Sequence, residues 1–250
     1  MQILTGTSGY GYKEWKGNFY PDKIPANKML AFYASKLATV EINNTFYRMP
    51  TANMVYSWAQ QVPDGFTFVI KAPQIITHVK RMKDTKEETH YFLKTISSLG
   101  NKLGPALFQF PGSFHANIPL LAEFLDSVPK KSMCAFLFRH KSWFKDETSD
   151  LLRSHKQALC FEDADENPID SIVPTASWGY LRLRKTDYTD NDLSQWANKV
   201  LAQDWQKAFV FFKHEDDAAA RGPQLAASFN EIVSREASPK EEKMAFLMAD

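Results

Sequence analysis

Two patterns of apolar residues alternate along the chain. Short runs rich in β-branched and aromatic residues are typical of strands, and between them lie longer segments whose apolar residues return every three or four positions, as on one face of a helix. In the segment 191–205 the apolar positions i, i+3, i+4, i+7 and i+8 are Leu193, Trp196, Ala197, Val200 and Leu201. The pattern predicts strands and helices in alternation.

Eight strands are predicted, at 2–8, 39–43, 66–71, 106–110, 134–139, 158–163, 179–184 and 208–214. Helical patterns follow all but the sixth, at 27–37, 52–62, 86–103, 117–128, 146–156, 191–205 and 222–235. After the sixth strand only the short segment 168–174 is present. Eight strand–helix repeats in 250 residues favour a single (β/α)8 TIM barrel. The main alternative, a doubly wound open sheet, usually has fewer strands and a glycine-rich phosphate loop after the first, which this sequence lacks.

The whole chain, residues 1–250, is predicted to form one domain, because no linker or low-complexity tract divides it. The charged and then apolar tail from about residue 237 is expected to be a frayed end or a docked helix. Cys134 and Cys160 each lie in an apolar run, which favours reduced core thiols. No stretch approaches ~18 consecutive apolar residues, and the start lacks the pattern of a signal peptide. We therefore expect a cytoplasmic protein without a membrane partner.

Polar side chains stand near the C-terminal end of nearly every predicted strand. In the second strand Val40 and Ile42 share the face expected to contact helices, which leaves Glu41 and Asn43 pointing into the barrel. Alternation or position at a strand end also selects Lys71, Gln109, Arg139, His140, Asp163, Arg182, Arg184 and His214. This end of a TIM barrel carries the active site. The sequence therefore predicts one polar pocket at the mouth of the barrel.

The motifs around these positions are characteristic of a known family. They read VEINNTFYRMP, FTFVIKAPQIITH, KLGPALFQFP, FRHKSWF and GYLRLRKTDY. From about residue 4 to 228 the chain resembles the YecE-like proteins, catalogued as domain of unknown function 72. The resemblance implies a TIM barrel and no particular activity. The positions that match typical family residues are Glu41, Asn43, Tyr47, Lys71, His78, Gln109, Pro111, Arg139, His140, Trp143, Asp163, Arg182, Tyr188 and His214. One position differs from the typical family residue: this chain has Leu137 where the family usually has a glutamate.

Several of these residues have both a chemical and a structural interpretation. Glu41 is the candidate general base, and Arg139 and Arg182 form a candidate anion clamp, since guanidinium groups grip two oxygens of a phosphate or carboxylate. Alternatively, Glu41, Asp163 and Glu162 pair with these arginines inside the barrel. His214 and His78 are the further catalytic candidates. The ligand-binding candidates are Asn43, Tyr47, Lys71, Gln109, Arg139, His140, Trp143, Asp163, Arg182, Arg184 and Tyr188.

Alternation turns His140 toward the helix layer, so it ranks below the other two histidines as an acid–base candidate. The aromatic residues that follow the strands either pack the loops or form a stacking wall for a sugar or base; they are Tyr10, Tyr12, Trp15, Phe19, Tyr20, Phe46, Tyr47, Trp143, Phe144 and Tyr188. Metal ligands are not expected, because no two acidic or histidine side chains have the short spacing of a metal motif and the cations oppose a divalent ion. We expect no cofactor.

The predicted function is an enzyme acting on a small anionic substrate, such as a phosphorylated sugar or a nucleotide, by hydrolysis or isomerisation. A TIM barrel hosts many chemistries, so two alternatives stay open. A nucleic-acid-processing protein would need a basic strip beyond the pocket, and the net charge of +1 weighs against it. A small-ligand-binding protein without catalysis is the second alternative.

Overall fold

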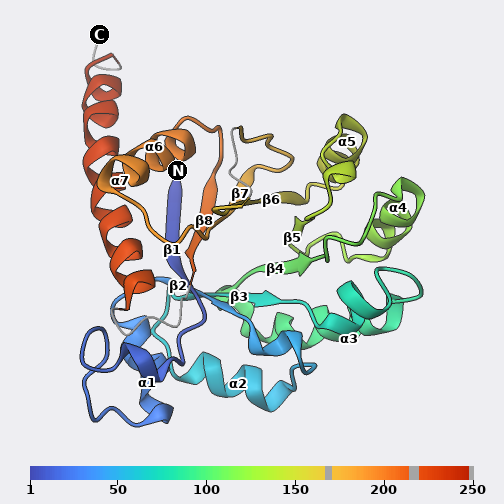
Figure 1. Ribbon diagram of the computed structural model, residues 1–250, viewed down its shortest axis with the longest axis horizontal. Helices are drawn as coiled ribbons and strands as arrows, with labels where there is room; N and C mark the ends of the chain where they lie inside the picture. The colour runs from blue at the N-terminus through green and yellow to red at the C-terminus, as the bar shows by residue number, and fades with distance from the viewer. Residues whose placement is uncertain (167–170, 214–219, 248–250) are drawn as a thin grey trace.

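A closed barrel of eight parallel strands forms the centre of the computed structural model (Figure 1). The structure describes residues 1–166, 171–213 and 220–247, with side chains described up to residue 237. The strands are β1 Gln2–Ser8, β2 Thr39–Ile42, β3 Thr67–Lys71, β4 Leu103–Gln109, β5 Cys134–Leu137, β6 Ala158–Asp163, β7 Trp178–Leu183 and β8 Lys207–Phe212. They pair in chain order, and β8 closes on β1. The predicted TIM barrel is confirmed.

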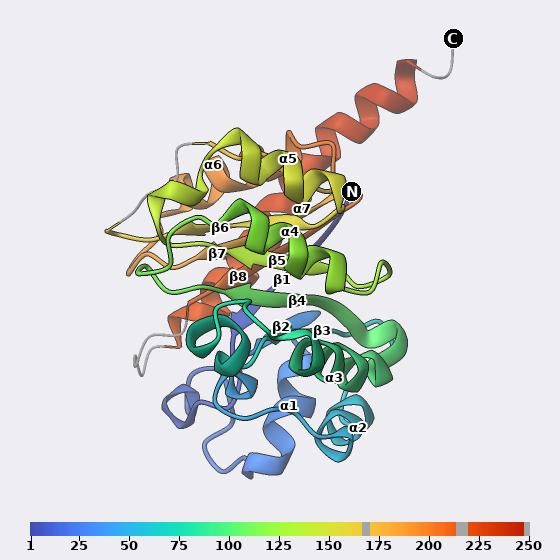
Figure 2. The ribbon, with the colours of Figure 1, turned by 90° about the vertical axis from the view of Figure 1, so that its right-hand side faces the viewer.

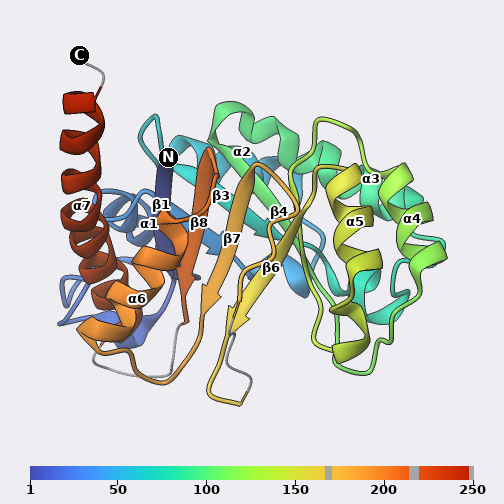
Figure 3. The ribbon, with the colours of Figure 1, turned by 90° about the horizontal axis from the view of Figure 1, so that it is seen from above.

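Helices cover the outside of this barrel (Figures 1 and 3). They are α1 Ala26–Ala34, α2 Ala52–Gln60, α3 Lys86–Ile96, α4 Ile118–Ser127, α5 Asp146–Ser154, α6 Asp190–Leu201 and α7 Arg221–Leu247. A capping box formed by Thr189 and Asp192 begins α6, with each side chain bonded to the other residue's backbone N–H. No helix that crosses a membrane is found in the described part of the chain.

Several element boundaries differ from the predicted ones, including the start of β4 at Leu103 and the end of α6 at Leu201. The third helical segment ends at Ile96 and continues as the 3-10 turn Ser97–Lys102, in which Gly100 adopts a φ of 57° that favours glycine. Strand β5 ends at Leu137, two residues before the predicted end. The last helix does not stop near residue 235 but runs on to Leu247, and Figure 2 shows its end extending beyond the barrel.

Alternation along the strands separates an outer core from an inner one. Val40 and Ile42 belong to the outer cluster beneath the helices, as predicted. The inner cluster fills the barrel and includes Leu4, Val69, Leu107, Leu137, Cys160, Phe209 and Phe211. Both cysteines are buried and free. Toward the C-terminal ends of the strands the inner residues become polar, and these side chains form the candidate site.

Candidate functional site

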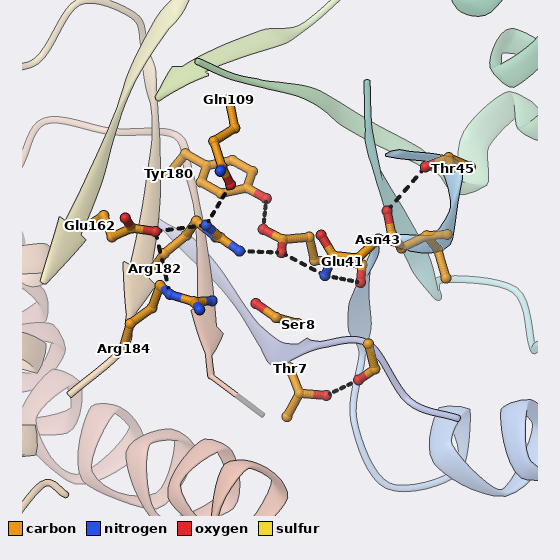
Figure 4. A network of polar contacts seen from close by, with 12 residues as sticks. Thr7, Ser8, Glu41, Asn43, Thr45, Gln109, Glu162, Tyr180, Arg182 and Arg184 are labelled. Carbon is orange, nitrogen blue, oxygen red and sulfur yellow. Dashed lines mark hydrogen bonds and ion pairs between the residues drawn. The ribbon is translucent and has the colours of Figure 1, made fainter. Parts of the chain in front are cut away.

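Glu41 lies inside the barrel with 0% of its surface exposed. Its carboxylate accepts hydrogen bonds from Tyr180 Oη at 2.6 Å, Arg182 Nη2 at 3.0 Å and Asn43 Nδ2 at 3.0 Å (Figure 4). Burial alone would raise its pKa, but Arg182, Tyr180, Lys71 and Asn43 outweigh burial and lower the pKa to about 2. Glu41 is therefore ionised at neutral pH and fully engaged by its neighbours.

Arg182 joins this carboxylate to a second one. Its Nη1 donates to Glu162 Oε2 at 2.7 Å and to Gln109 Oε1 at 3.2 Å. The other oxygen of Glu162 accepts from Arg139 Nη2 at 3.1 Å, and Arg184 Nε lies 3.4 Å from Oε2. The predicted pairing of these arginines with carboxylates is thus present, although the partners are Glu41 and Glu162 and not Asp163.

A cavity of about 300 Å³ opens above this network at the mouth of the barrel. Its lining consists of Ser8, Tyr12, Asn43, Phe46, Tyr47, Lys71, Gln109, Arg139, Arg182 and Arg184. Seven of these ten were selected from the sequence, and their roles stay predictions. Four of the lining side chains are cations and none is a carboxylate.

Lys71 differs from the other cations of the mouth. Its Nζ lies 4.4 Å from the centroid of the Phe46 ring, and among the described residues it has no hydrogen-bond or ion-pair partner. Burial, together with Arg182 and the other nearby arginines, lowers its pKa from 10.5 to about 8, against the opposing effect of Glu41. Lys71 is therefore the group at the mouth that exchanges a proton near neutral pH.

Three buried polar atoms of the cavity wall have no hydrogen-bond partner among the described residues: Ser8 Oγ, Asn43 Oδ1 and Arg182 Nε. The orientation of the Asn43 amide is fixed, because its Nδ2 donates to the Glu41 carboxylate and faces the Glu41 carbonyl oxygen, so Oδ1 is left as an acceptor. A buried polar group without a partner costs about 1–3 kcal/mol. Three such atoms on one wall suit a ligand that supplies the missing bonds.

Asp163 and Tyr188, which were selected as ligand-binding candidates, do not line this cavity. Asp163 follows Glu162 on β6 and so faces the helices, where it accepts hydrogen bonds from Tyr188 Oη at 3.1 Å and Trp196 Nε1 at 3.2 Å. Lys185 Nζ lies 3.3 Å from the same oxygen. This cluster fastens the loop after β7 and helix α6 to the barrel.

Trp143 and His140 are also turned away from the cavity. Trp143 is 1% exposed, donates to the Phe114 carbonyl oxygen at 2.7 Å and stacks on Phe138 at 4.1 Å. His140 accepts from the Ser142 backbone N–H through Nδ1 and stacks on the His115 ring at 3.8 Å. Of the aromatic residues considered for a stacking wall, Trp143 and Tyr188 therefore pack within the loops, whereas Tyr12, Phe46 and Tyr47 line the cavity.

His78 stands behind the mouth in the turn Ile75–Val79. Its ring packs edge-on against Phe46 at 4.8 Å, so Phe46 contacts both His78 and Lys71. Burial and the positive charges of Lys71, Arg139 and Arg81 lower its pKa, which leaves it neutral at neutral pH. His78 is not part of the cavity lining. His214, the other predicted catalytic histidine, lies outside the described residues.

Sequence reasoning missed Tyr180 and Ser8. It considered Tyr12 and Phe46 only for an aromatic wall, and Glu162 only as a partner of the arginines. Tyr180 stands two residues before Arg182 on β7, so the alternation that turned Arg182 inward applied to it as well. Ser8 is the last residue of β1 and faces inward by the same rule. No group of three or more potential metal ligands is found in the described part of the chain.

Comparison with known proteins identifies the family to which this chain belongs. Residues 4–245 match the sequence profile described as "Protein of unknown function DUF72". The chain belongs to the DUF72 family. The UPF0759 protein YunF of Bacillus subtilis (strain 168) is 32% identical over 269 residues, which cover 89% of this chain and 93% of YunF. The UPF0759 protein YecE of Escherichia coli (strain K12) is 30% identical over 146 residues, which cover 57% of this chain and 54% of YecE.

Solved DUF72 structures share the barrel. A DUF72 family protein from Thermotoga maritima MSB8 superposes with a TM-score of 0.82 at 26% identity, covering 94% of this chain and all of its own length. A second, from Enterococcus faecalis V583, reaches a TM-score of 0.76 at 19% identity and supports the fold alone. The family is thus identified, and the chemistry has to be argued from the mouth itself.

Proposed function

We propose that this DUF72 protein is a cytoplasmic enzyme that acts on a small, hydroxylated anion, such as a phosphorylated sugar, bound at the mouth of the barrel. The observation that carries the proposal is the combination of four lining cations with three unpartnered polar atoms in one cavity. Each of these two features specifies a different part of the ligand.

The charges argue for an anion. Lys71, Arg139, Arg182 and Arg184 supply four positive charges, while Glu41 and Glu162 supply two negative ones, so two positive charges remain. A phosphate monoester carries about −1.5 to −2 at neutral pH, which is the charge that would balance them. Bidentate contacts from guanidinium groups suit phosphate oxygens.

The unpartnered atoms argue for hydroxyl groups. Arg182 Nε needs a hydrogen-bond acceptor and Asn43 Oδ1 needs a donor, while the Ser8 hydroxyl can pair with a donor or with an acceptor. An inorganic anion offers chiefly acceptors, whereas a sugar hydroxyl both donates and accepts. The cavity of about 300 Å³ lies at the small end of ligand sites, which favours a sugar phosphate over a nucleotide.

Proton transfer at this mouth is better assigned to Lys71 than to Glu41. A general acid or base works best with a pKa near the working pH. Glu41, with a pKa of about 2 and three hydrogen bonds, fits the role of holding Arg182 and Asn43 in position. Lys71, with a pKa of about 8, fits acid–base steps of an isomerisation or hydrolysis.

Ligand-dependent thermal unfolding tests the proposal. Ribose 5-phosphate should raise the Tm in proportion to the logarithm of its concentration, while ribose should not. Arg184→Ala should lose most of this shift, because Arg184 lines the cavity, and Arg235→Ala on the exposed face of α7 should keep it. Equal shifts in both variants would place the anion elsewhere. No shift with any sugar phosphate would reject the proposal.

Catalysis is tested separately by following the bound sugar phosphate in solution. Conversion of the sugar by wild-type protein, lost in Lys71→Met, supports an enzyme. A saturable ligand that is always returned unchanged would instead favour the alternative of a binding protein without catalysis.

A further inference from the structure

The backbone of Lys71 is fixed at the mouth of the barrel, and its amine lines the cavity, as a nucleophile would. It is the last residue of β3, where it is paired with Leu107 of β4. Its carbonyl oxygen accepts a hydrogen bond from Thr45 Oγ1 at 2.6 Å, so the backbone at the mouth is fixed on both sides. The side chain lines the cavity, and its amine rests 4.4 Å from the centroid of the Phe46 ring.

The other cations of the mouth are occupied by carboxylates. Arg182 bonds to Glu41 and Glu162, and Arg139 bonds to Glu162. The amine of Lys71 has no such partner among the described residues. A lysine whose only task is to neutralise charge would gain from a carboxylate, but Glu41 nearby accepts its hydrogen bonds from Tyr180, Arg182 and Asn43.

The surroundings of Lys71 also favour its uncharged form. An amine attacks a carbonyl group only when it is neutral, and enzymes reach this state by burial and by placing other cations nearby. Both causes operate here and bring the pKa of Lys71 to about 8. A substantial neutral fraction is therefore present just above neutral pH.

We propose that Lys71 forms a Schiff base with the carbonyl carbon of a phosphorylated aldehyde or ketone. This inference rests on the proposed function, because the arginines of the same cavity would hold the phosphate. The Nζ lone pair adds to the carbonyl carbon while the C=O π electrons move to oxygen. A proton passes from nitrogen to oxygen, and the carbinolamine then loses water as C=N forms.

This step is balanced without any further reactant. Both hydrogen atoms of the water that leaves come from the amine, and nothing is oxidised or reduced. Protonation of the imine by solvent would make it an electron sink, which acidifies the neighbouring C–H bond. Loss of a proton from that carbon and its return on the other face would invert the configuration there, and addition of water to the imine would then release the isomerised product and regenerate the Lys71 amine.

Reductive trapping tests the proposal. The protein is incubated with glyceraldehyde 3-phosphate and sodium cyanoborohydride and then analysed by intact mass and peptide mapping. We expect one adduct per chain, on Lys71. Lys71→Arg, which keeps the positive charge, should lose it, while Lys94→Arg on the exposed face of α3 should keep it. Adducts spread over many lysines, or unchanged in Lys71→Arg, would overturn the assignment.

Two further ligands separate this inference from the proposed function. Glycerol 3-phosphate has the phosphate but no carbonyl group, so it should raise the Tm and compete with trapping without forming an adduct. A retained Tm shift with no trapped adduct from the aldehyde overturns the Schiff base and leaves the anion site standing. Trapping on Lys71 that is equally efficient with unphosphorylated glyceraldehyde supports the amine chemistry and rejects the anion site.

Discussion

Glu41 illustrates how a charged residue is accommodated inside a barrel strand. A buried carboxylate is costly unless it is paired and hydrogen-bonded, and here Arg182, Tyr180 and Asn43 together satisfy it. The pair also orients Arg182, whose Nη1 reaches Glu162 on the other side. One carboxylate thereby positions the guanidinium group that contributes to the cavity floor.

Glu41→Gln should destabilise the protein by about 3 kcal/mol, because it leaves a buried guanidinium group without its full counter-charge. The free energy of unfolding in urea measures this change. Glu123→Gln, the same substitution at an exposed site on α4, serves as the control and should leave the midpoint unchanged. Equal midpoints for the two variants would mean that Glu41 contributes nothing through its charge.

The stability that the Glu41 charge contributes should depend on pH within a defined range. Its pKa is lowered from 4.5 to about 2 on folding, so the contribution is complete above pH 4.5 and is lost as pH falls toward 2. The difference in unfolding free energy between wild type and Glu41→Gln should therefore shrink across this range. If the difference in unfolding free energy between the two proteins stays constant down to about pH 2, the ion pair between Glu41 and Arg182 is contradicted.

Lys71 should show the opposite dependence on pH. Its pKa falls from 10.5 in the unfolded chain to about 8 in the folded protein, so the unfolded chain binds more protons between these values and stability rises with pH. Lys71→Met should be more stable than wild type at about pH 7, and the gap should narrow by about pH 9.5. Urea unfolding at both pH values checks this, with Lys94→Met as the surface control.

At the scale of elements, β1, β2 and α1 meet at one close contact. The Tyr33 hydroxyl from α1 accepts from the Thr7 backbone N–H at 2.8 Å and donates to the Thr39 carbonyl oxygen at 3.0 Å. Gly6 faces this point, and a Cβ atom there would lie 2.0 Å from the Thr39 carbonyl oxygen. The approach of β1 to β2, and hence the position of Glu41, depends on the absence of a side chain at Gly6.

Gly6→Ala should therefore cost about 2–3 kcal/mol, since the obstructing atom is backbone and cannot move aside. Thermal and urea unfolding give the value. Gly11→Ala, where nothing lies within 4 Å of the added Cβ atom, is the matched control and should be close to neutral. A tolerated Gly6→Ala would show that the first two strands adjust more freely than their contacts indicate.

Inside strands, sequence alternation predicted which side chains point into the barrel, whereas position at a strand end alone did not separate cavity residues from the others. Glu41, Gln109 and Arg182 were assigned correctly because each stands in a strand whose apolar neighbours mark the other face. Asp163 and His140 were selected for standing at strand ends, where a polar residue serves equally well to fasten a loop. The partners of Glu41 lie more than a hundred residues away, and local patterns carry no information about them.

At the scale of the whole molecule, the mouth carries a local excess of positive charge, while the chain as a whole is nearly neutral. The net charge is +1, although four cations line one cavity. Leu137, at the end of β5, adds no charge to this region, because its apolar side chain belongs to the inner core. Such a field draws a small anion into a concave site and provides no track for a polymer.

The protein should therefore not bind nucleic acid. Short single-stranded and double-stranded DNA should show no retardation and no rise in fluorescence anisotropy at low salt, where phosphate contacts are strongest. Sugar phosphates should still shift the Tm under the same conditions. Binding of DNA that weakens steeply with added salt would instead favour the nucleic-acid-processing alternative.

The shortest strand pairing has a kinetic consequence. β5 and β6 are in register at only two residue pairs, Ala135 with Ala158 and Phe136 with Leu159, whereas β1 and β8 share six. Above these pairs the Arg139–Glu162 ion pair links the ends of the two strands. Partial opening of a protein begins where the fewest hydrogen bonds must break, so the barrel should open along this seam first. Amide protons of β5 and β6 should exchange with deuterium sooner than those of β1 and β8, and a bound phosphate contacting Arg139 should slow that exchange.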